Sequence, residues 1–216
     1  MPMNLKYYKT KGIIVLVAIL IVVANILIKV FGPYADILIE GRFKEEIKII
    51  SDYLDVFGVL GIVGVILWLI DTYLWKTWAF SWLVDLPNIS GRYEGILQSD
   101  YNGSFQMHIV LEICQTASQV KINGYFANHG TTLQTSTSYS YSELITKGQD
   151  GFYTLSYQFA NAPNLTSTQI YQHGGTVSLK YFPDIKSLKG EYYNIRKNLG
   201  TIDITFKDKK LLGRFQ

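Results

Sequence analysis

An uncharged apolar run near the amino terminus constrains the fold of this chain most strongly. Residues 12–28 consist almost entirely of Ile, Val, Leu and Ala, and Lys11 and Lys29 bracket them. A helix of about 20 residues crosses the roughly 30 Å hydrocarbon core of a bilayer, and residues 12–31 have that length. The run is long for a secretory signal peptide, and no small-x-small cleavage site follows it. It therefore predicts an uncleaved transmembrane helix.

A second apolar run, residues 56–70, predicts a second membrane span. Tyr73, Trp75 and Trp78 follow it, and such aromatic side chains are enriched where a helix leaves the membrane. The alternative interpretation is a buried helix of a soluble domain.

The connector between the two runs also has a helical pattern. Its large apolar side chains recur at spacings of three and four residues: Phe43, Ile47, Ile50, Leu54 and Phe57. This seam predicts one long helix from about Ala35 to Trp75. Gly58, Gly61 and Gly64 then fall on one side of that helix, where small residues allow helices to approach closely. They serve either packing of the two spans within one chain or association between chains.

Basic residues at the amino terminus predict the orientation. Lys6, Lys9 and Lys11 form a leader without acids beside the first span, and positively charged flanks stay on the cytoplasmic side. We therefore expect the amino terminus to be cytoplasmic, the connector to lie outside, and everything after Trp75 to be cytoplasmic. The single cysteine, Cys114, is compatible with a reducing compartment.

The chain after Pro87 has the pattern of an all-β domain. It divides into short alternating segments separated by Gly, Asn, Asp and Pro: 91–100, 104–114, 119–128, 134–146, 151–160, 176–182, 187–196 and 201–206. We therefore predict two transmembrane α-helices in residues 1–87, followed in residues 88–216 by a small eight-stranded antiparallel, lipocalin-like β-barrel. Such a barrel holds side chains or one small ligand inside. A β-sandwich is the alternative.

Alternation along the seventh segment predicts a ligand site. Lys189 and Glu191 share the parity that faces water, whereas Tyr192, Asn194 and Arg196 share the other. If that face lines the lumen, a buried guanidinium needs a carboxylate, a group of carbonyls or an anionic ligand. No acid in the sequence clearly shares the interior parity of its neighbours, which favours the ligand.

Tyrosines extend this prediction, because their rings stack on nucleobases and their hydroxyls bond to phosphates. Tyrosine is also an ordinary strand residue, so any single one is more often a packing residue. The candidate ligand-binding residues are Arg196, Asn194, Tyr192, Tyr93 and Tyr157. On the second segment, His108 and Glu112 are interpreted as a solvated face.

Other functional classes lack support in the sequence. There is no phosphate-binding or dinucleotide-binding glycine motif and no Gly-x-Ser-x-Gly. The three histidines lack metal-ligand spacing, and a net charge of +3 does not favour binding to duplex nucleic acid. We therefore expect a protein that is not an enzyme, with no cofactor, no metal, and no DNA or RNA polymer as partner.

The start of the β domain carries two resemblances. Gly91-Arg92-Tyr93 resembles the Gly-x-Trp start of lipocalin-like barrels, in which a late arginine covers the aromatic ring; Arg214 is the candidate here. The two spans and the stretch LPNISGRYEGILQSDY (residues 86–101) together resemble the SMODS-associating 2TM β-strand-rich effectors. These are membrane β-barrel effectors of bacterial cyclic-oligonucleotide antiphage signalling (CBASS).

That family resemblance implies a function. In such systems a nucleotidyltransferase makes a cyclic dinucleotide on infection and the barrel binds it. The two-span proteins then assemble and breach the bacterial inner membrane, killing the cell before phage matures. Partners would be the cyclic dinucleotide, the lipid bilayer and further copies of the chain. The alternatives are a membrane-tethered, lipocalin-like carrier of an apolar ligand and an interaction module whose lumen is filled by its own side chains.

Overall fold

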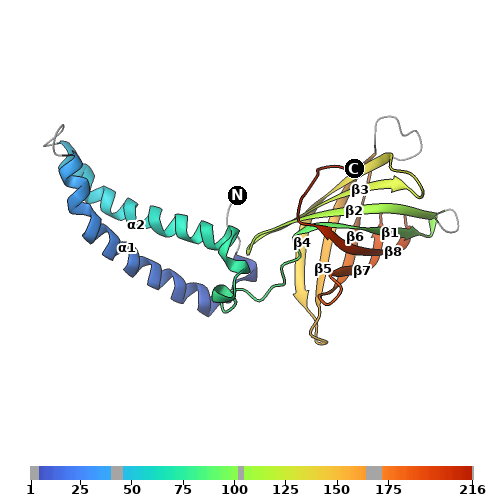
Figure 1. Cartoon of the computed structure of the whole chain (residues 1–216), viewed down its shortest axis with the longest axis horizontal. Helices are drawn as coiled ribbons and strands as arrows, with labels where there is room; N and C mark the ends of the chain where they lie inside the picture. The colour runs from blue at the N-terminus through green and yellow to red at the C-terminus, as the bar shows by residue number, and fades with distance from the viewer. Residues whose placement is uncertain (1–4, 40–45, 102–104, 164–171, 216) are drawn as a thin grey trace. The chain divides into compact units, whose positions relative to one another are not determined.

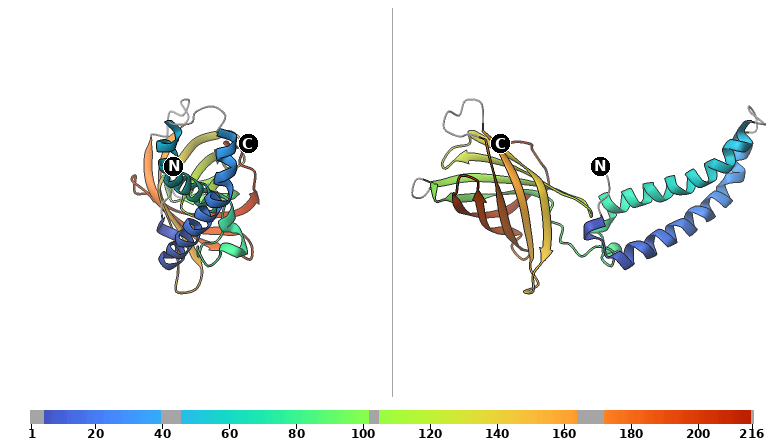
Figure 2. Two further views of the ribbon diagram at one scale, coloured as in Figure 1. Left: turned by 90° about the vertical axis from the view of Figure 1, so that its left-hand side faces the viewer. Right: turned by 180° about the vertical axis from the view of Figure 1, so that it is seen from behind.

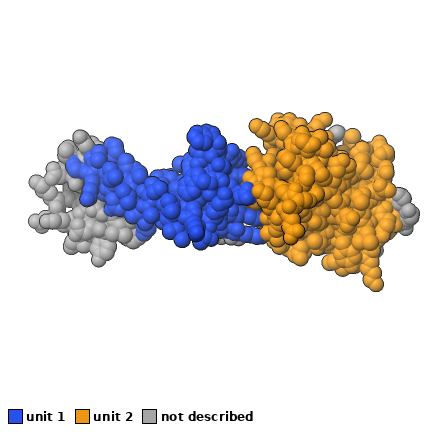
Figure 3. All heavy atoms as spheres, turned by 90° about the horizontal axis from the view of Figure 1, so that it is seen from below, with its two compact units in different colours: residues 1–85, 116–118 blue, residues 86–115, 119–216 orange. Residues whose placement is uncertain are grey.

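The computed structural model describes residues 5–39, 46–101, 105–163 and 172–215. It divides into two compact units, coloured separately in Figure 3. The first comprises residues 1–85 with 116–118, and the second comprises residues 86–115 with 119–216.

The first unit is built from two long helices (Figure 1). Helix α1 spans Thr10–Ile39 and α2 spans Glu46–Thr72; short 3₁₀ turns are η1 at Leu5–Tyr7, η2 at Leu74–Lys76 and η3 at Trp78–Phe80. Among the described residues, one segment, Thr10–Phe31, is long and apolar enough to cross a membrane. The second apolar segment, Gly58–Thr72, is shorter than a full span.

The prediction of one helix from Ala35 to Trp75 is wrong at both ends. Residues 35–39 belong to α1, which continues through Pro33, and α2 runs only from Glu46 to Thr72. The side chains of the proposed seam at 43–57 lie outside the described residues.

The helices pack through one face of each. On α1 the buried side chains recur every three or four residues: Ile13, Leu16, Leu20 and Ala24. On α2, Gly58 faces α1, since a Cβ added there would lie 3.5 Å from the Cδ1 of Ile28. A Cβ added at Gly61 or Gly64 would meet nothing within 4 Å. Among the described residues, packing between the helices therefore uses only the first of the three glycines.

The second unit is a closed barrel in which each strand pairs with its neighbours in sequence (Figures 1 and 2). The strands are β1 Gly91–Ser99, β2 Phe105–Gln115, β3 Val120–Asn128, β4 Gln134–Lys147, β5 Tyr153–Pro163, β6 His173–Phe182, β7 Ser187–Asn194 and β8 Leu199–Asp208. The predicted eight-stranded antiparallel barrel is confirmed, and the sandwich alternative is wrong. Gly95 allows β8 to close on β1, because a Cβ there would lie 2.0 Å from the Asp203 carbonyl oxygen.

One end of the barrel is packed with its own side chains. Tyr93 is 1% exposed and meets Phe206 edge-on, with ring centroids 5.6 Å apart. Leu111, Ile113 and other large side chains from the surrounding strands are fully buried. The prediction that Arg214 covers the Tyr93 ring is wrong, because Arg214 is exposed and Phe206 packs against that ring. We call this the closed end.

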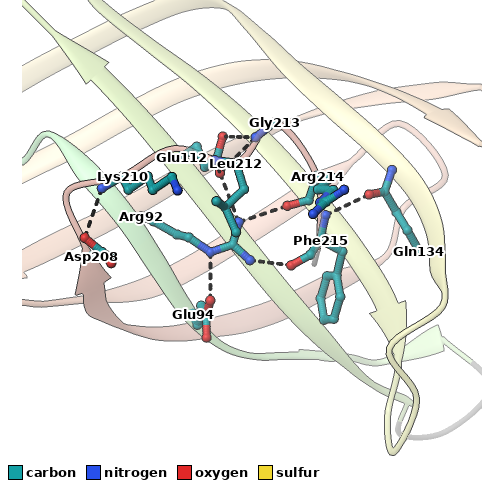
Figure 4. Close-up of polar contacts among 10 residues, drawn as sticks. All are labelled: Arg92, Glu94, Glu112, Gln134, Asp208, Lys210, Leu212, Gly213, Arg214 and Phe215. Atoms are coloured by element: carbon teal, nitrogen blue, oxygen red, sulfur yellow. Dashed lines mark hydrogen bonds and ion pairs between the residues drawn. The ribbon is translucent and has the colours of Figure 1, made fainter.

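The carboxy-terminal residues 209–215, here called the C-terminal strap, cross the outside of the barrel. Phe215 is buried there against three outward-facing residues, Val110, Tyr125 and Ala127. Its backbone N–H donates to Gln134 Oε1 at 2.9 Å, as Figure 4 shows. The strap therefore shields an apolar patch that alternation alone assigns to solvent.

A buried ion pair anchors the strap (Figure 4). Arg92 and Glu112 are 3% and 2% exposed and lie 2.9 Å apart. Glu112 also accepts the N–H groups of Leu212, at 2.7 Å, and Gly213, at 3.1 Å. Arg92 donates to the Arg214 and Phe215 carbonyl oxygens. The prediction that Glu112 lies on a solvated face is therefore wrong, because the strap covers that face.

Arg92→Leu should destabilise the barrel by about 3–5 kcal/mol, because it leaves the Glu112 carboxylate buried without its cation. Lys189→Met is the control: its pair with Asp203 is 2.8 Å long but about half exposed on both sides, so removing it should cost about 1 kcal/mol or less. Urea unfolding of the full chain in detergent, followed by circular dichroism, measures both. Equal midpoints for the two variants would contradict this role of the ion pair.

Candidate ligand-binding cavity of the barrel

The other end of the barrel holds a cavity of about 110 Å³. Asn161 near the end of β5, His173 at the start of β6 and Asn194 at the end of β7 mark this end. One wall is apolar and includes Leu97, Met107, Ile109, Phe126, Val177 and Ile202. We call this the cavity end.

Another part of the lining, here called the polar wall, is polar but uncharged. Strand β4 contributes Ser136 and Ser138, both buried, and β5 contributes Asn161. Sequence reasoning missed these residues because it searched for charged and aromatic side chains. The signal that could have found them is the run of serines at alternate positions of one strand, which places hydroxyls on the inner face.

Three of the five predicted ligand-binding residues line the cavity: Tyr157, Tyr192 and Asn194. Burial raises the pKa of both phenols, so both remain neutral hydrogen-bond donors. Asn194 is 5% exposed, and its Oδ1 accepts the N–H groups of Arg196 at 3.0 Å and Asn198 at 3.1 Å. Its oxygen therefore holds the turn between β7 and β8, which leaves the amide nitrogen for a ligand.

The structure places Arg196 and Tyr93 elsewhere. Strand β7 ends at Asn194, two residues before the predicted 187–196 segment does, so the strand prediction is too long. Arg196 lies in the following turn with an exposed side chain, next to Lys197. Tyr93 lies in the core of the closed end and is not among the cavity-lining side chains.

Charged side chains lie at the rim of the cavity and not among the side chains that line it. Among the described residues, the lining side chains include no Lys, Arg, Asp or Glu, and His173 is the titratable imidazole. Arg196 and Lys197 put two cations in the turn at this end. Within the described part of the chain, no group of three metal-ligating side chains occurs. The site therefore offers neutral donors and acceptors inside, with Arg196 and Lys197 in the turn at its mouth and Asp100 beside that turn, where its Oδ1 accepts the Leu199 N–H.

Comparison with known families identifies the barrel. The model of the Cap15 cyclic dinucleotide receptor domain matches residues 84–206, more than half of the chain. The chain belongs to this family. The match begins just before β1 and ends within β8, so it covers the barrel and stops short of the strap. It confirms the resemblance to the CBASS effectors with two membrane spans.

Two curated relatives agree with the family match. The CD-NTase-associated protein 15 of Escherichia albertii is 26% identical over 141 residues, which cover 62% of this chain and 68% of that protein. The protein of the same name from Yersinia aleksiciae is 28% identical over 147 residues, which cover 66% of each chain. The chain therefore matches about two thirds of the length of each relative.

Asn194→Ala should lower the stability of the ligand-free protein by about 1–3 kcal/mol, because two turn N–H groups lose their acceptor. Asn198→Ala is the control, since Asn198 takes part in the turn through its backbone. Thermal melting of the full chain, followed by circular dichroism, compares them. An unchanged melting temperature for Asn194→Ala would show that the side chain does not hold the turn.

Proposed function

We propose that this chain is a membrane effector activated by a cyclic dinucleotide. In this proposal the cytoplasmic barrel binds the second messenger made during phage infection, and the helices then assemble in the bacterial inner membrane and disrupt it, causing abortive infection. The observation that carries the proposal is the receptor-domain family match, which falls on a barrel with a neutral, partly polar cavity. The apolar segment Thr10–Phe31 supports the membrane location.

The cavity supports a particular pose of the ligand, with a base inside and the phosphates at the mouth. A phosphate is costly to bury among neutral side chains, and the cavity volume of about 110 Å³ is below the roughly 300–1,000 Å³ of ordinary small-molecule pockets. Only part of a dinucleotide therefore fits inside. Arg196 at the rim meets the phosphates, and Tyr157, Tyr192 and Asn194 contact the base.

This pose changes the role of one predicted residue and disfavours the alternative function. Tyr93 supports the floor of the barrel through Phe206 and does not contact the base. A carrier of an apolar ligand needs room for a hydrocarbon chain and gains nothing from buried amides and hydroxyls. The small volume and polar wall therefore favour the nucleotide.

Assembly in the membrane requires a helix surface that is unused within one chain. Gly61 and Gly64 are exposed on α2, and no described residue would lie within 4 Å of a Cβ added at either position. Small residues of this kind allow helices of neighbouring chains to pack closely. The ligand drives assembly only if it binds the assembled state more tightly. The short apolar segment Gly58–Thr72 serves as the second span, and the lysine leader keeps the amino terminus cytoplasmic.

The first test is calorimetric titration of the full chain in detergent with five 3′,3′-cyclic dinucleotides: di-AMP, di-GMP, di-UMP, AMP–GMP and UMP–AMP. Wild type should bind one selectively. Arg196→Ala should weaken that affinity by about 10-fold or more, since a charge-assisted hydrogen bond contributes about 1.5–3 kcal/mol. Thermal melting of Arg196→Ala and wild type, without ligand, shows whether the variant is equally stable.

Lys207→Ala is the matched control, because Lys207 is an exposed cation on β8 toward the closed end. It should bind as wild type does. Equal affinities for the two variants would remove Arg196 from the site, and no binding of any of the five compounds by folded wild type would overturn the proposed ligand class.

The second test separates binding from assembly. Gly61→Leu should bind the dinucleotide within about twofold of wild type but lose ligand-dependent release of dye from liposomes, because a bulky side chain blocks close helix approach. Ile66→Leu, on the opposite side of α2, should retain release. Dye release by Gly61→Leu at the wild-type rate would contradict the proposed assembly surface.

A further inference from the structure

Asn161, a second asparagine of the cavity wall, differs from Asn194 in its hydrogen bonding. Asn161 is 4% exposed and lines the cavity. Within the described part of the chain, its Oδ1 accepts no hydrogen bond. By contrast, Asn194 Oδ1 accepts two. The cavity wall therefore contains a buried acceptor that the described residues leave unsatisfied.

Leaving such a group unpaired is costly. A buried acceptor without a donor destabilises a fold, and most native buried polar atoms have a partner. Leucine has the same number and branching of side-chain heavy atoms as asparagine and would avoid this cost. The strand context offers no other reason for an amide, since the neighbouring inward positions of β5, Phe159 and Tyr157, pack as aromatic side chains.

The position of Asn161 indicates what supplies the missing donor. It lies between Ser138 on β4 and His173 on β6 in the strand register, on the polar wall of a cavity without charged lining residues. Phosphate oxygens carry no donor at neutral pH. Nucleobases carry N–H donors beside acceptors on their edges, which an asparagine amide matches with its oxygen and nitrogen.

We propose that Asn161 reads the nucleobase that enters the cavity, its Oδ1 accepting a base N–H. Asn161 is then a specificity-determining residue of the receptor. This inference rests on the proposed function and deepens it, because it assigns the hydrogen-bonding edge of the base, and not the ribose or phosphate, to the polar wall.

The test measures the melting temperature and the ligand affinity of one variant of the full chain in detergent. Asn161→Leu should melt at the same temperature as wild type or higher, because the unpaired acceptor is gone. It should bind the tightest of the five dinucleotides about 10- to 100-fold more weakly. A merely structural asparagine would lower the melting temperature on substitution.

The matched control is Ser187→Ala. Ser187 is fully buried at the start of β7, and its Oγ is also without a partner among the described residues, but it does not line the cavity. Removing it should leave the melting temperature equal or higher and the affinity unchanged. The control separates relief of an unpaired group from loss of ligand contact.

Two modified ligands test the same bond without relying on a variant. An analogue methylated at the base N–H should bind wild type at least 10-fold more weakly and lose less affinity with Asn161→Leu, as expected for two groups that interact. A 2′-deoxy analogue should bind wild type normally. A ribose contact would reverse these two results and overturn the proposal.

The outcomes for the proposed function and for this inference are distinguishable. If wild type binds none of the five dinucleotides, both are overturned. If wild type binds and Asn161→Leu binds equally well, the proposed function stands and the reading of the base by Asn161 is overturned. A lowered melting temperature with unchanged affinity would overturn it in the same way.

Discussion

Closure of the barrel by pairing of β8 with β1 is the constraint on which the rest of the structure depends. Once the sheet closes, side chains of alternate positions on every strand share one enclosed volume. At one end large apolar residues such as Tyr93 and Phe206 fill that volume. At the other end serines and asparagines replace them, and a small neutral cavity remains. The difference between the two ends therefore follows from which residues occupy the inward positions, and not from any change of fold.

In the proposed pose, a neutral interior and cations at the rim allow a small barrel to receive a dianionic ligand. Placing both phosphates inside would require buried cations, which are costly unless they are well paired. In that pose, Arg196 in the exposed turn contacts the phosphates. The interior then contributes shape and hydrogen bonds, which in this proposal discriminate between bases. Affinity and specificity are thus assigned to different parts of the site.

Much of the fold could be predicted from the sequence, because strand alternation and turn residues are local signals. The misses arise where distant segments decide the outcome. Strand alternation predicts that Glu112 is solvated, but the C-terminal strap covers it. Alternation also predicts that Arg196 faces the lumen, but the strand ends at Asn194, whose side chain accepts a hydrogen bond from the following turn. The candidate site was partly found through Tyr157 and Tyr192. Asn161 was not predicted because its proposed role depends on a hydrogen-bond acceptor that has no partner among the described residues. Only the folded structure reveals such an acceptor.

Hydrogen–deuterium exchange of the full chain in detergent, with and without a saturating amount of the tightest-binding dinucleotide, tests the central claim most directly. The account predicts slower exchange on ligand binding at the cavity end, in residues 134–138 of β4, 159–163 of β5 and the 195–198 turn. The closed end and the C-terminal strap should exchange at unchanged rates. Protection confined to the strap or the closed end, with the cavity end unaffected, would contradict it and place the ligand on the outside of the barrel.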